Sequence, residues 1–457
     1  MSKHTVFIIS LGCAKNLVDS EVMLGKLQEK NFQIAGSIDE AELIVINTCG
    51  FLQSAVTEAI DKILEAAQYK KTGSCKKLVI AGCMVERYRD ELKNDLPEVD
   101  AFLSVNDILN VDLDVQTSQS LSDPNHRVSF LYDNSMTRVL SSGGHLAYVK
   151  IADGCNRPCA FCIIPKLRGF YRSRGLDSVM REIVGFIENG VKEINLIAQD
   201  TTNYGKDLEG QTSIHDLLDE ISKLSVGDDY WVRLMYAYPL GINERLIKQM
   251  RDNPHVCNYI DLPLQHISSK MLRAMKRPFD EVKTKELVQN MKRWNPELSL
   301  RTTFIVGFPG ETEEDIALLG DFIAEGHFDH VGVFAYSPEE EAAAFKLGDN
   351  ISEAEKQQRV KHIMLCQQKV VQKKLSALVG TTQKVLIEGF HPETDLLLAG
   401  RTQWQAPEVD GIVIINDVVS DDGSALPDIS QYYNRFAQVE ITEFKGYDLV
   451  GKVSAIL

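Results

Sequence analysis

The chain has 457 residues, of which 44% are hydrophobic and 25% carry a charge. A single hydrophobic core rarely extends past about 250–300 residues, so we expect two or three domains. The formal charge of −16 argues against general nucleic-acid affinity, because phosphate binding needs a basic surface, and it favours a basic protein partner.

The sequence carries no recognisable membrane or export signal. No stretch approaches the roughly 20 apolar residues of a membrane span, and the apolar run Thr5–Ser10 is too short for a signal peptide. We therefore expect a cytoplasmic protein. In that reducing compartment the nine cysteines, an odd number, favour metal ligands or catalytic groups over disulfides.

The first domain, expected over residues 1–135, alternates apolar runs with helical patterns. The apolar runs predict buried parallel strands, and the amphipathic segments between them predict helices. The strands are expected at Thr5–Ser10, Leu43–Ile46 and Leu78–Ala81, and the helices at Asp19–Lys30 and Ala55–Ala67. This βαβα order predicts a doubly wound α/β domain.

A polar, irregular stretch from about Gln116 to Gly144 marks a boundary, and a second domain is expected over residues 141–378. Six apolar runs alternate there with helical patterns, which predicts a partial TIM-like (β/α)6 barrel. The runs are Ala147–Ala152, Ile194–Ala198, Trp231–Tyr236, Tyr259–Leu262, Leu298–Val306 and His330–Phe334. Helix-capping boxes are predicted at Thr312 with Asp315, and at Ser352 with Glu355 before a long helix reaching about Leu378.

The last domain, expected over residues 379–457, has a different pattern. Short alternating runs lie there between turn residues, at Val385–Glu388, Ile412–Ile415 and Phe436–Phe444. This pattern predicts a small antiparallel β-barrel.

Cys155, Cys159 and Cys162 form a CxxxCxxC run with an aromatic residue before the last cysteine. The run follows the first predicted barrel strand, at the face where such barrels carry their active sites. Thiolates are soft ligands suited to iron–sulfur clusters or zinc. Three cysteines can hold three irons of a 4Fe–4S cluster and leave the fourth iron open to chelate S-adenosylmethionine. We therefore predict that these three residues are catalytic and that their cluster cleaves this cofactor to a 5′-deoxyadenosyl radical.

The alternative for this run is a structural zinc site. Such sites have four ligands, typically supplied by spaced CxxC pairs. No fourth cysteine lies near the run, and His145 before the strand is the nearest other candidate. The count of three ligands favours the cluster.

Cys13, Cys49 and Cys83 lie far apart in the sequence, but each follows the end of a predicted strand. Because the carboxyl ends of parallel strands meet at one edge of a sheet, the three thiols could converge on a second cluster. The neighbouring Gly12, Gly50 and Gly82 would permit tight turns and close backbone approach. The alternative is three buried core cysteines. Cys75, Cys257 and Cys366 fit neither set, and no catalytic role is expected for them.

Taken together, these features resemble the radical S-adenosylmethionine methylthiotransferase family. The resemblance rests on Ser10-Leu11-Gly12-Cys13-Ala14-Lys15-Asn16 with Val18–Glu21, on Asn47–Phe51, and on Gly154-Cys155-Asn156 with Arg168-Gly169 and Ser173-Arg174. The three-domain layout agrees, so the resemblance covers nearly the whole chain.

The resemblance implies two 4Fe–4S clusters and a C-terminal TRAM domain. The cluster on Cys13, Cys49 and Cys83 would hold the sulfur to be inserted, and one S-adenosylmethionine would methylate that sulfur. A second would be cleaved at the other cluster. The resulting radical would remove hydrogen from an unactivated carbon, which then captures the methylthio group.

The resemblance also implies contacts to the cofactor or substrate for four polar residues that follow or lie on barrel strands. They are Gln199, Asp200, Gln265 and Arg301. The alternative for each is an ordinary polar group at a strand end. Arg168, Arg172 and Arg174 could neutralise the cofactor or a carboxylate, or they could lie in a solvated loop. Where the family continues with Gly-Thr after Glu340, this chain has Glu341-Ala342, a departure that concerns loop geometry rather than chemistry.

Two subfamilies share this chemistry: one modifies an adenosine in transfer RNA, and the other, called RimO, modifies the β-carbon of an aspartate in small-subunit ribosomal protein S-twelve. From Gly380 to Leu457 the chain has five lysine and arginine residues against twelve aspartate and glutamate residues, a difference of −7. An acidic domain repels phosphates and attracts a basic protein, which favours the ribosomal substrate. Pro407–Gly411 also resembles the RimO pattern.

A different class of function is a non-catalytic iron–sulfur or zinc scaffold that binds ribosomes. The chemistry predicted above instead needs an electron donor, and a flavodoxin or ferredoxin is expected from the family. A monomer is the expected oligomeric state.

Overall fold

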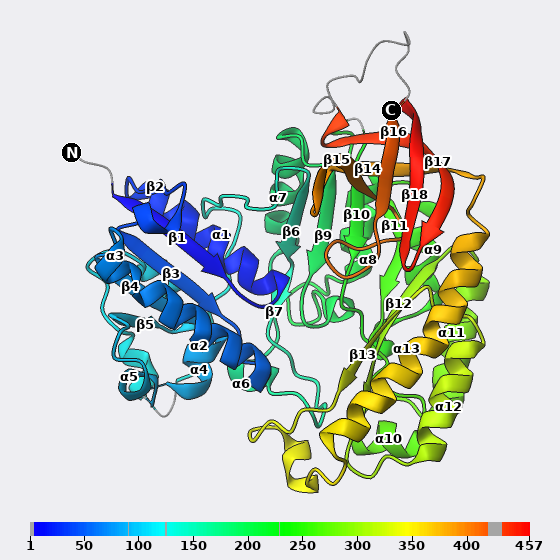
Figure 1. The fold of residues 1–457 in the computed structure, drawn as a ribbon, viewed down its shortest axis with the longest axis horizontal. Helices are drawn as coiled ribbons and strands as arrows, with labels where there is room; N and C mark the ends of the chain where they lie inside the picture. The colour runs from blue at the N-terminus through cyan, green and yellow to red at the C-terminus, as the bar shows by residue number, and fades with distance from the viewer. Residues whose placement is uncertain (1–3, 90, 124–125, 228, 419–431) are drawn as a thin grey trace.

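The computed structural model describes residues 4–89, 91–123, 126–227, 229–418 and 432–457. Figure 1 shows three units in chain order: an N-terminal sheet flanked by helices, a larger central sheet with its own helices, and a small β-barrel packed against the central unit. The predicted α/β class with a C-terminal β-barrel is confirmed.

The N-terminal unit is a five-stranded parallel sheet in the order β2-β1-β3-β4-β5. Ile44 and Ile46 of β3 pack with helix α2, whereas Leu43 and Val45 pack with α1, so helices cover both faces of the sheet. The elements are β1 (Thr5–Ser10), α1 (Ala14–Glu29), β2 (Gln33–Ile34), β3 (Leu43–Thr48), α2 (Gln53–Ala67), α3 (Tyr69–Thr72), β4 (Lys77–Gly82), α4 (Cys83–Tyr88), α5 (Glu91–Asp95) and β5 (Ala101–Leu103).

The predicted irregular stretch contains no strand or α-helix in its described part, residues 116–123 and 126–144. Side chains of this stretch nevertheless form buried contacts with both neighbouring units. Arg138 is buried and pairs with Glu21 of α1 at 2.5 Å and with Glu182 of α7 at 2.8 Å. The Tyr132 hydroxyl donates to the same Glu182 at 3.0 Å. Buried ion pairs therefore join the first two units through their connecting segment.

The central unit is a six-stranded parallel sheet in the order β13-β12-β11-β10-β9-β6, with helices packed on it. It forms the predicted partial barrel. Its strands are β6 (Leu146–Lys150), β9 (Glu193–Ile197), β10 (Trp231–Leu234), β11 (Val256–Asp261), β12 (Ser299–Val306) and β13 (His330–Ala335). Its helices are α6 (Ile164–Arg168), α7 (Leu176–Glu188), α8 (Ile214–Ser222), α9 (Glu244–Asp252), α10 (Ser269–Ala274), α11 (Glu281–Trp294), α12 (Glu313–Ala324) and α13 (Glu353–Ser376). A short antiparallel pair, β7 (Ala152–Asp153) with β8 (Arg172–Ser173), borders the cysteine loop.

Of the two capping boxes predicted in this unit, one is complete in the structure and the other is partial. Thr312 and Asp315 form the complete reciprocal box at the start of α12. At the start of α13 the Ser352 hydroxyl accepts from the Glu355 N–H at 3.3 Å, but the Glu355 carboxylate binds Arg359 at 2.5 Å. The second box is therefore only half formed, because an ion pair one turn along the helix takes the carboxylate.

The C-terminal unit is a closed barrel in the order β14-β15-β16-β18-β17. Its neighbours pair antiparallel except β16 and β18, which run parallel. The strands are β14 (Thr382–His391), β15 (Thr394–Thr402), β16 (Val413–Val418), β17 (Arg435–Lys445) and β18 (Asp448–Ile456). Arg401 of β15 pairs at 2.7 Å with the buried Glu193 of β9, which attaches the barrel to the central sheet. Within the described ranges of the chain, no helix combines the length and apolarity needed to cross a membrane.

Candidate active site

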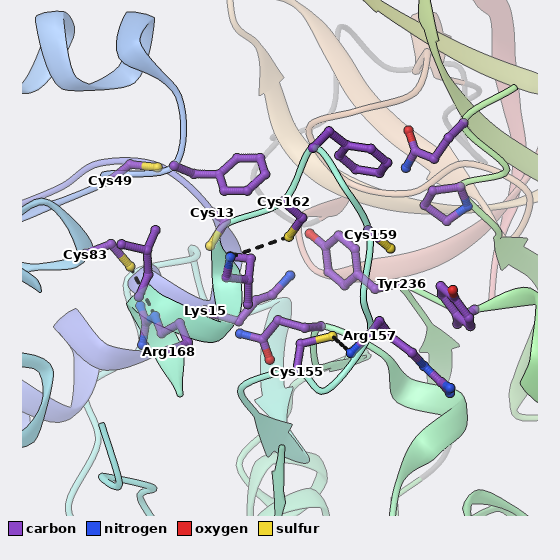
Figure 2. A pocket seen from close by; sticks show the side chains of 18 of the residues that line it. Cys13, Lys15, Cys49, Cys83, Cys155, Arg157, Cys159, Cys162, Arg168 and Tyr236 are labelled. Atoms are coloured by element: carbon purple, nitrogen blue, oxygen red, sulfur yellow. Dashed lines mark hydrogen bonds between the residues drawn. The ribbon is translucent and has the colours of Figure 1, made fainter. Parts of the chain in front are cut away.

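All six cysteines of the two predicted sets line one cavity of about 360 Å³ (Figure 2). The cavity lies where the N-terminal unit meets the central unit. The N-terminal unit supplies one cysteine set and the central unit supplies the other. The Gln199 and Gln265 side chains predicted to contact a cofactor also line it. The other lining residues include four cations, Lys15, Arg157, Arg168 and Arg277, and two tyrosines, Tyr236 and Tyr238. Cys75, Cys257 and Cys366 are not among the lining residues.

The first cysteine set lies at the carboxyl edge of the N-terminal sheet. Cys13 follows β1, Cys49 follows β3, and Cys83 begins α4 directly after β4. The strand order reverses between β1 and β3, and open α/β sheets bind ligands in the crevice at such a point. The loops there converge as the sequence predicted.

Glycines make this close approach possible. Gly12 has a φ of +93°, and a Cβ added to it would lie 2.7 Å from Cys49 Cβ. A Cβ on Gly50 would lie 2.6 Å from the Cys83 carbonyl oxygen. Real Cβ atoms do not tolerate such contacts, so any larger residue at either position would push the cysteine loops apart.

The second set lies in the loop between β7 and α6, and hydrogen-bond donors surround its sulfurs. The backbone N–H groups of Arg157 and Ile164 donate to Cys155 Sγ at 3.4 Å and to Cys162 Sγ at 3.5 Å. The Arg277 guanidinium donates to Cys159 Sγ at 3.4 Å. Donors aimed at sulfur stabilise the negative charge that a metal-bound thiolate carries.

Burial keeps one free thiol of each set protonated. It raises the pKa of Cys83 and of Cys162 to about 12. Because thiolates are the metal-binding form, loading a metal at either set would release protons.

The described residues contain no group of three or more histidine, cysteine, aspartate or glutamate side chains placed to hold a metal ion. His145, the candidate fourth zinc ligand, instead pairs with Glu388 of the C-terminal barrel at 3.2 Å. The fit to iron–sulfur clusters therefore rests on the donor set: two groups of three soft thiols, with N–H donors on their sulfurs, around one shared cavity.

Arg168, at the end of α6, joins the two sides of the cavity. It is fully buried, and its Nε donates to Cys83 Sγ at 3.1 Å (Figure 2). Its Nη1 pairs with both Asp19 of α1 at 2.6 Å and Asp153 at 3.2 Å. Lys150 binds the same two carboxylates at 2.5 and 3.0 Å. Burial would raise the pKa of Asp153, but the Lys150 and Arg168 charges lower it below its ordinary value.

The four residues expected to contact cofactor or substrate separate into two pairs. Gln199 donates to Asp153 at 2.7 Å, and its Oε1 is buried with no hydrogen-bond partner among the described residues. Gln265 has a φ of +76°, and its buried Oε1 also has no hydrogen-bond partner among the described residues. Both face the cavity, so each offers an acceptor to a bound ligand.

Asp200 and Arg301 do not line the cavity. Asp200 accepts from Arg157 at 2.7 Å and so orients a lining residue rather than a ligand. Arg301 pairs with Asp410 at 2.6 Å, at the junction with the C-terminal barrel. Arg174 is buried against Glu182, and Arg172 donates to backbone carbonyls, so neither occupies a solvated loop.

Several lining residues were not predicted from the sequence, among them Lys15, Tyr236 and Arg277. Lys15 is part of the segment that carried the family resemblance, two residues after Cys13. Tyr236 and Arg277 come from loops of the central unit that have no motif around them, so only folding brings them to the cavity.

Three family models match the chain in succession. Residues 5–104 match an uncharacterized protein family, UPF0004; residues 149–323 match the radical SAM superfamily; and residues 379–453 match the TRAM domain. The second match extends over the loop of Cys155, Cys159 and Cys162.

Curated relatives match the chain from end to end. A protein of Geobacter sulfurreducens named ribosomal protein uS12 methylthiotransferase RimO is 42% identical and covers 99% of both chains. A protein of Syntrophotalea carbinolica with the same name is 43% identical over 99% of this chain and 97% of its own.

Solved structures share the fold of about three quarters of the chain at low identity. TsrM from Kitasatospora setae, a radical S-adenosylmethionine methyltransferase with cobalamin and a [4Fe-4S] cluster bound, aligns with a TM-score of 0.55 at 13% identity over 74% of this chain and 77% of its own. The cobalamin-dependent enzyme OxsB aligns with a TM-score of 0.51 at 11% identity over 79% of this chain and 56% of its own.

The chain is similar to its curated relatives from end to end, and three domain models match it in succession. This chain therefore belongs to the RimO family of radical S-adenosylmethionine methylthiotransferases.

Proposed function

We propose that this protein attaches a methylthio group to the β-carbon of an aspartate side chain in ribosomal protein uS12. The observation that carries the proposal is that two three-cysteine sets line one cavity. A cavity with two such sets suits a reaction that must activate a carbon and supply sulfur to it at the same place.

In this proposal each set holds one 4Fe–4S cluster. Cys155, Cys159 and Cys162 would hold the cluster that binds S-adenosylmethionine, and Cys13, Cys49 and Cys83 would hold the cluster that carries the sulfur. Bound together, the cluster of the second cysteine set and S-adenosylmethionine supply radical chemistry able to remove hydrogen from an unactivated carbon. Gln199 and Gln265 would offer their unpartnered amide oxygens to the cofactor. Arg277 and the Arg157 N–H would stabilise the thiolates, and the apolar wall of Phe51 and Phe161 would limit water.

The charge of the C-terminal barrel supports a protein substrate. Its five basic and twelve acidic residues make it acidic, and ribosomal proteins that bind RNA are basic. We propose that this protein acts in the cytoplasm as a monomer, with a reduced flavodoxin or ferredoxin as its electron donor.

Mass spectrometry of uS12 from cells with and without this gene tests the proposal. We expect uS12 from cells with the gene to be heavier by one methylthio group on a single aspartate, and the group to disappear without the gene. Modification that persists without the gene would contradict the proposal. Loss of methylthio-adenosine from transfer RNA, with uS12 unchanged, would instead establish the nucleic-acid substrate.

A further inference from the structure

Three of the four cations that line the cavity already have partners. Arg157 pairs with Asp200 at 2.7 Å and Arg168 with Asp19 at 2.6 Å. Arg277 donates to the Pro263 carbonyl at 2.6 Å and to Cys159 Sγ. Lys15 differs: among the described residues no carboxylate lies within ion-pair distance of its ammonium group and no acceptor is hydrogen-bonded to it. Its close contact is the face of the Tyr236 ring, 3.2 Å from Nζ to the ring centroid.

This arrangement leaves a buried amine with no carboxylate of the described residues within ion-pair distance. Lys15 is 7% exposed, and lysines that are buried to this extent in proteins are normally paired. An aromatic face replaces only part of the hydration that an ammonium loses. A carboxylate brought by a ligand would supply this partner and favour the ammonium form of Lys15.

Both Lys15 and the ring beneath it are held firmly. Lys15 lies in the first turn of α1, two residues after Cys13. Tyr236 has a φ of +58°, and its backbone N–H donates to Asp261 at 3.2 Å while its carbonyl accepts from Thr201 at 3.1 Å. The contact joins the N-terminal unit to the central unit, and cysteines of both sets surround it (Figure 2).

We propose that Lys15 binds the side-chain carboxylate of the target aspartate and thereby places the aspartate β-carbon between the two cysteine sets. This inference rests on the proposed function. The carboxyl carbon is bonded to the β-carbon, so an anchored carboxylate confines the reacting carbon to a small volume next to the anchor. The carboxylate of S-adenosylmethionine is not the expected partner, because the open iron of the second set would chelate it.

The test compares two synthetic peptides of the uS12 segment that contains the target, one with the aspartate and one with asparagine in its place. Fluorescence anisotropy measures the dissociation constant of each peptide for the cluster-loaded full-length protein, and mass spectrometry measures methylthiolation. The variants are Lys15→Met, Lys15→Arg, and Lys26→Met as the matched control. Lys26 lies on the same helix, outside the cavity, in an exposed pair with Glu29.

We expect the wild-type protein and Lys26→Met to bind the aspartate peptide roughly ten-fold or more tightly than the asparagine peptide, as for a buried charge pair that loses one partner. Lys15→Met should reduce this preference to about two-fold or less, chiefly by weakening the aspartate peptide. Lys15→Arg should retain most of the preference, because it retains the charge.

A Lys15→Met protein that keeps the full preference would overturn the inference. So would iron loss from the first cysteine set in both Lys15 variants, since that would place the role of Lys15 at the metal rather than at the substrate. Wild-type protein that methylthiolates the aspartate peptide without preferring it in binding would also overturn the inference, but would leave the proposed function standing. Wild-type protein that modifies neither the peptide nor intact uS12 would refute the proposed function itself.

Discussion

Arg168 joins buried charged groups of the N-terminal and central units. It contacts a cysteine of the first set and a carboxylate from each unit, although its own helix belongs to the central unit. Two cations and two anions balance there: Arg168 and Lys150 against Asp19 and Asp153. Such a network is stable only while every member keeps its partners, because a buried charge left alone is costly.

Replacing Arg168 with methionine should therefore leave Asp19 and Asp153 to share the single Lys150 charge. We expect the free energy of unfolding to fall by about 3–5 kcal/mol, the range for breaking a buried ion pair. Urea denaturation measures the change. Arg245→Met, which removes an exposed pair with Asp219, is the matched control and should cost less than about 1 kcal/mol. Equal unfolding midpoints for the two variants would contradict this view of Arg168.

Glu193 should make stability depend on pH. Burial would raise its pKa, but the Arg233 and Arg401 guanidinium groups lower it from 4.5 to about 2. A depressed carboxyl pKa contributes stability above the ordinary value, and that contribution is lost as pH falls from about 4.5 toward 2. The difference in unfolding free energy between wild type and Glu193→Gln, measured by urea denaturation at several pH values, should therefore be largest above pH 5 and shrink below it. A difference that stays constant between pH 7 and pH 3 would count against this assignment.

At the scale of elements, caps and strand ends determine where the chain turns toward the cavity. Helix α12 begins at a complete capping box, and the turn before it, Gly307–Thr312, connects to β12 of the central sheet. Asp315 of the box also accepts from Ser268 at 2.6 Å, which ties the start of α12 to the segment that precedes α10. Local capping and a tertiary contact thus support the same helix start.

Removing the Thr312 hydroxyl should weaken this helix start by a predictable amount. Thr312→Ala is expected to lower the free energy of unfolding by about 1 kcal/mol, the usual cost of losing an N-cap. Thr312→Ser keeps the hydroxyl and should stay near wild type. Thermal denaturation followed by circular dichroism measures both. A serine variant as unstable as the alanine variant would assign the effect to the lost methyl group instead.

At the scale of the whole molecule, the C-terminal barrel is attached to the central sheet by buried ion pairs. Asp410 accepts from Arg301 at 2.6 Å and from the Tyr259 hydroxyl at 2.7 Å. Arg401 binds Glu193, and Arg233 donates to the Gln403 carbonyl at 2.6 Å. The orientation of the acidic barrel relative to the cavity therefore depends on a few charged groups.

Asp410→Ala should loosen the attachment of the barrel to the central unit, because Arg301 and Tyr259 would lose their shared partner. Limited proteolysis should then cut faster between α13 and β14, around residues 377–381. Asp417→Ala, on the exposed part of the same barrel, is the control and should cut at the wild-type rate. Unchanged proteolysis of the Asp410 variant would show that apolar packing alone holds the barrel.

Much of the molecule could be predicted from the sequence, and the residues show why. The six central strands lie within a few residues of the predicted runs, because buried parallel strands are continuous apolar segments. Cys13, Cys49 and Cys83 form one predicted set because each follows a strand of one parallel sheet. The apolar runs are local features of the sequence, and the carboxyl ends of parallel strands share one edge of their sheet.

The directions of individual side chains could not be predicted in the same way. Asp200 directly follows Gln199, yet only Gln199 lines the cavity, since adjacent residues at a strand end point to different sides. Arg301 lies on the expected strand but faces the C-terminal barrel, because Asp410 from a distant segment attracts it. Glu355 has capping-box spacing, but Arg359 takes its carboxylate.

The class of each unit, the two predicted cysteine sets and the family resemblance could all be read from the amino-acid sequence, because motifs, spacing and periodicity are local properties of the chain. Three features depend on tertiary packing: both sets line one cavity, Arg168 binds Cys83 and carboxylates of both units, and Lys15 lies on the Tyr236 ring with no carboxylate of the described residues within ion-pair distance. These contacts join residues up to 221 positions apart, from Lys15 to Tyr236. Which side chains meet across such distances depends on how whole units pack, and no local pattern carries that information.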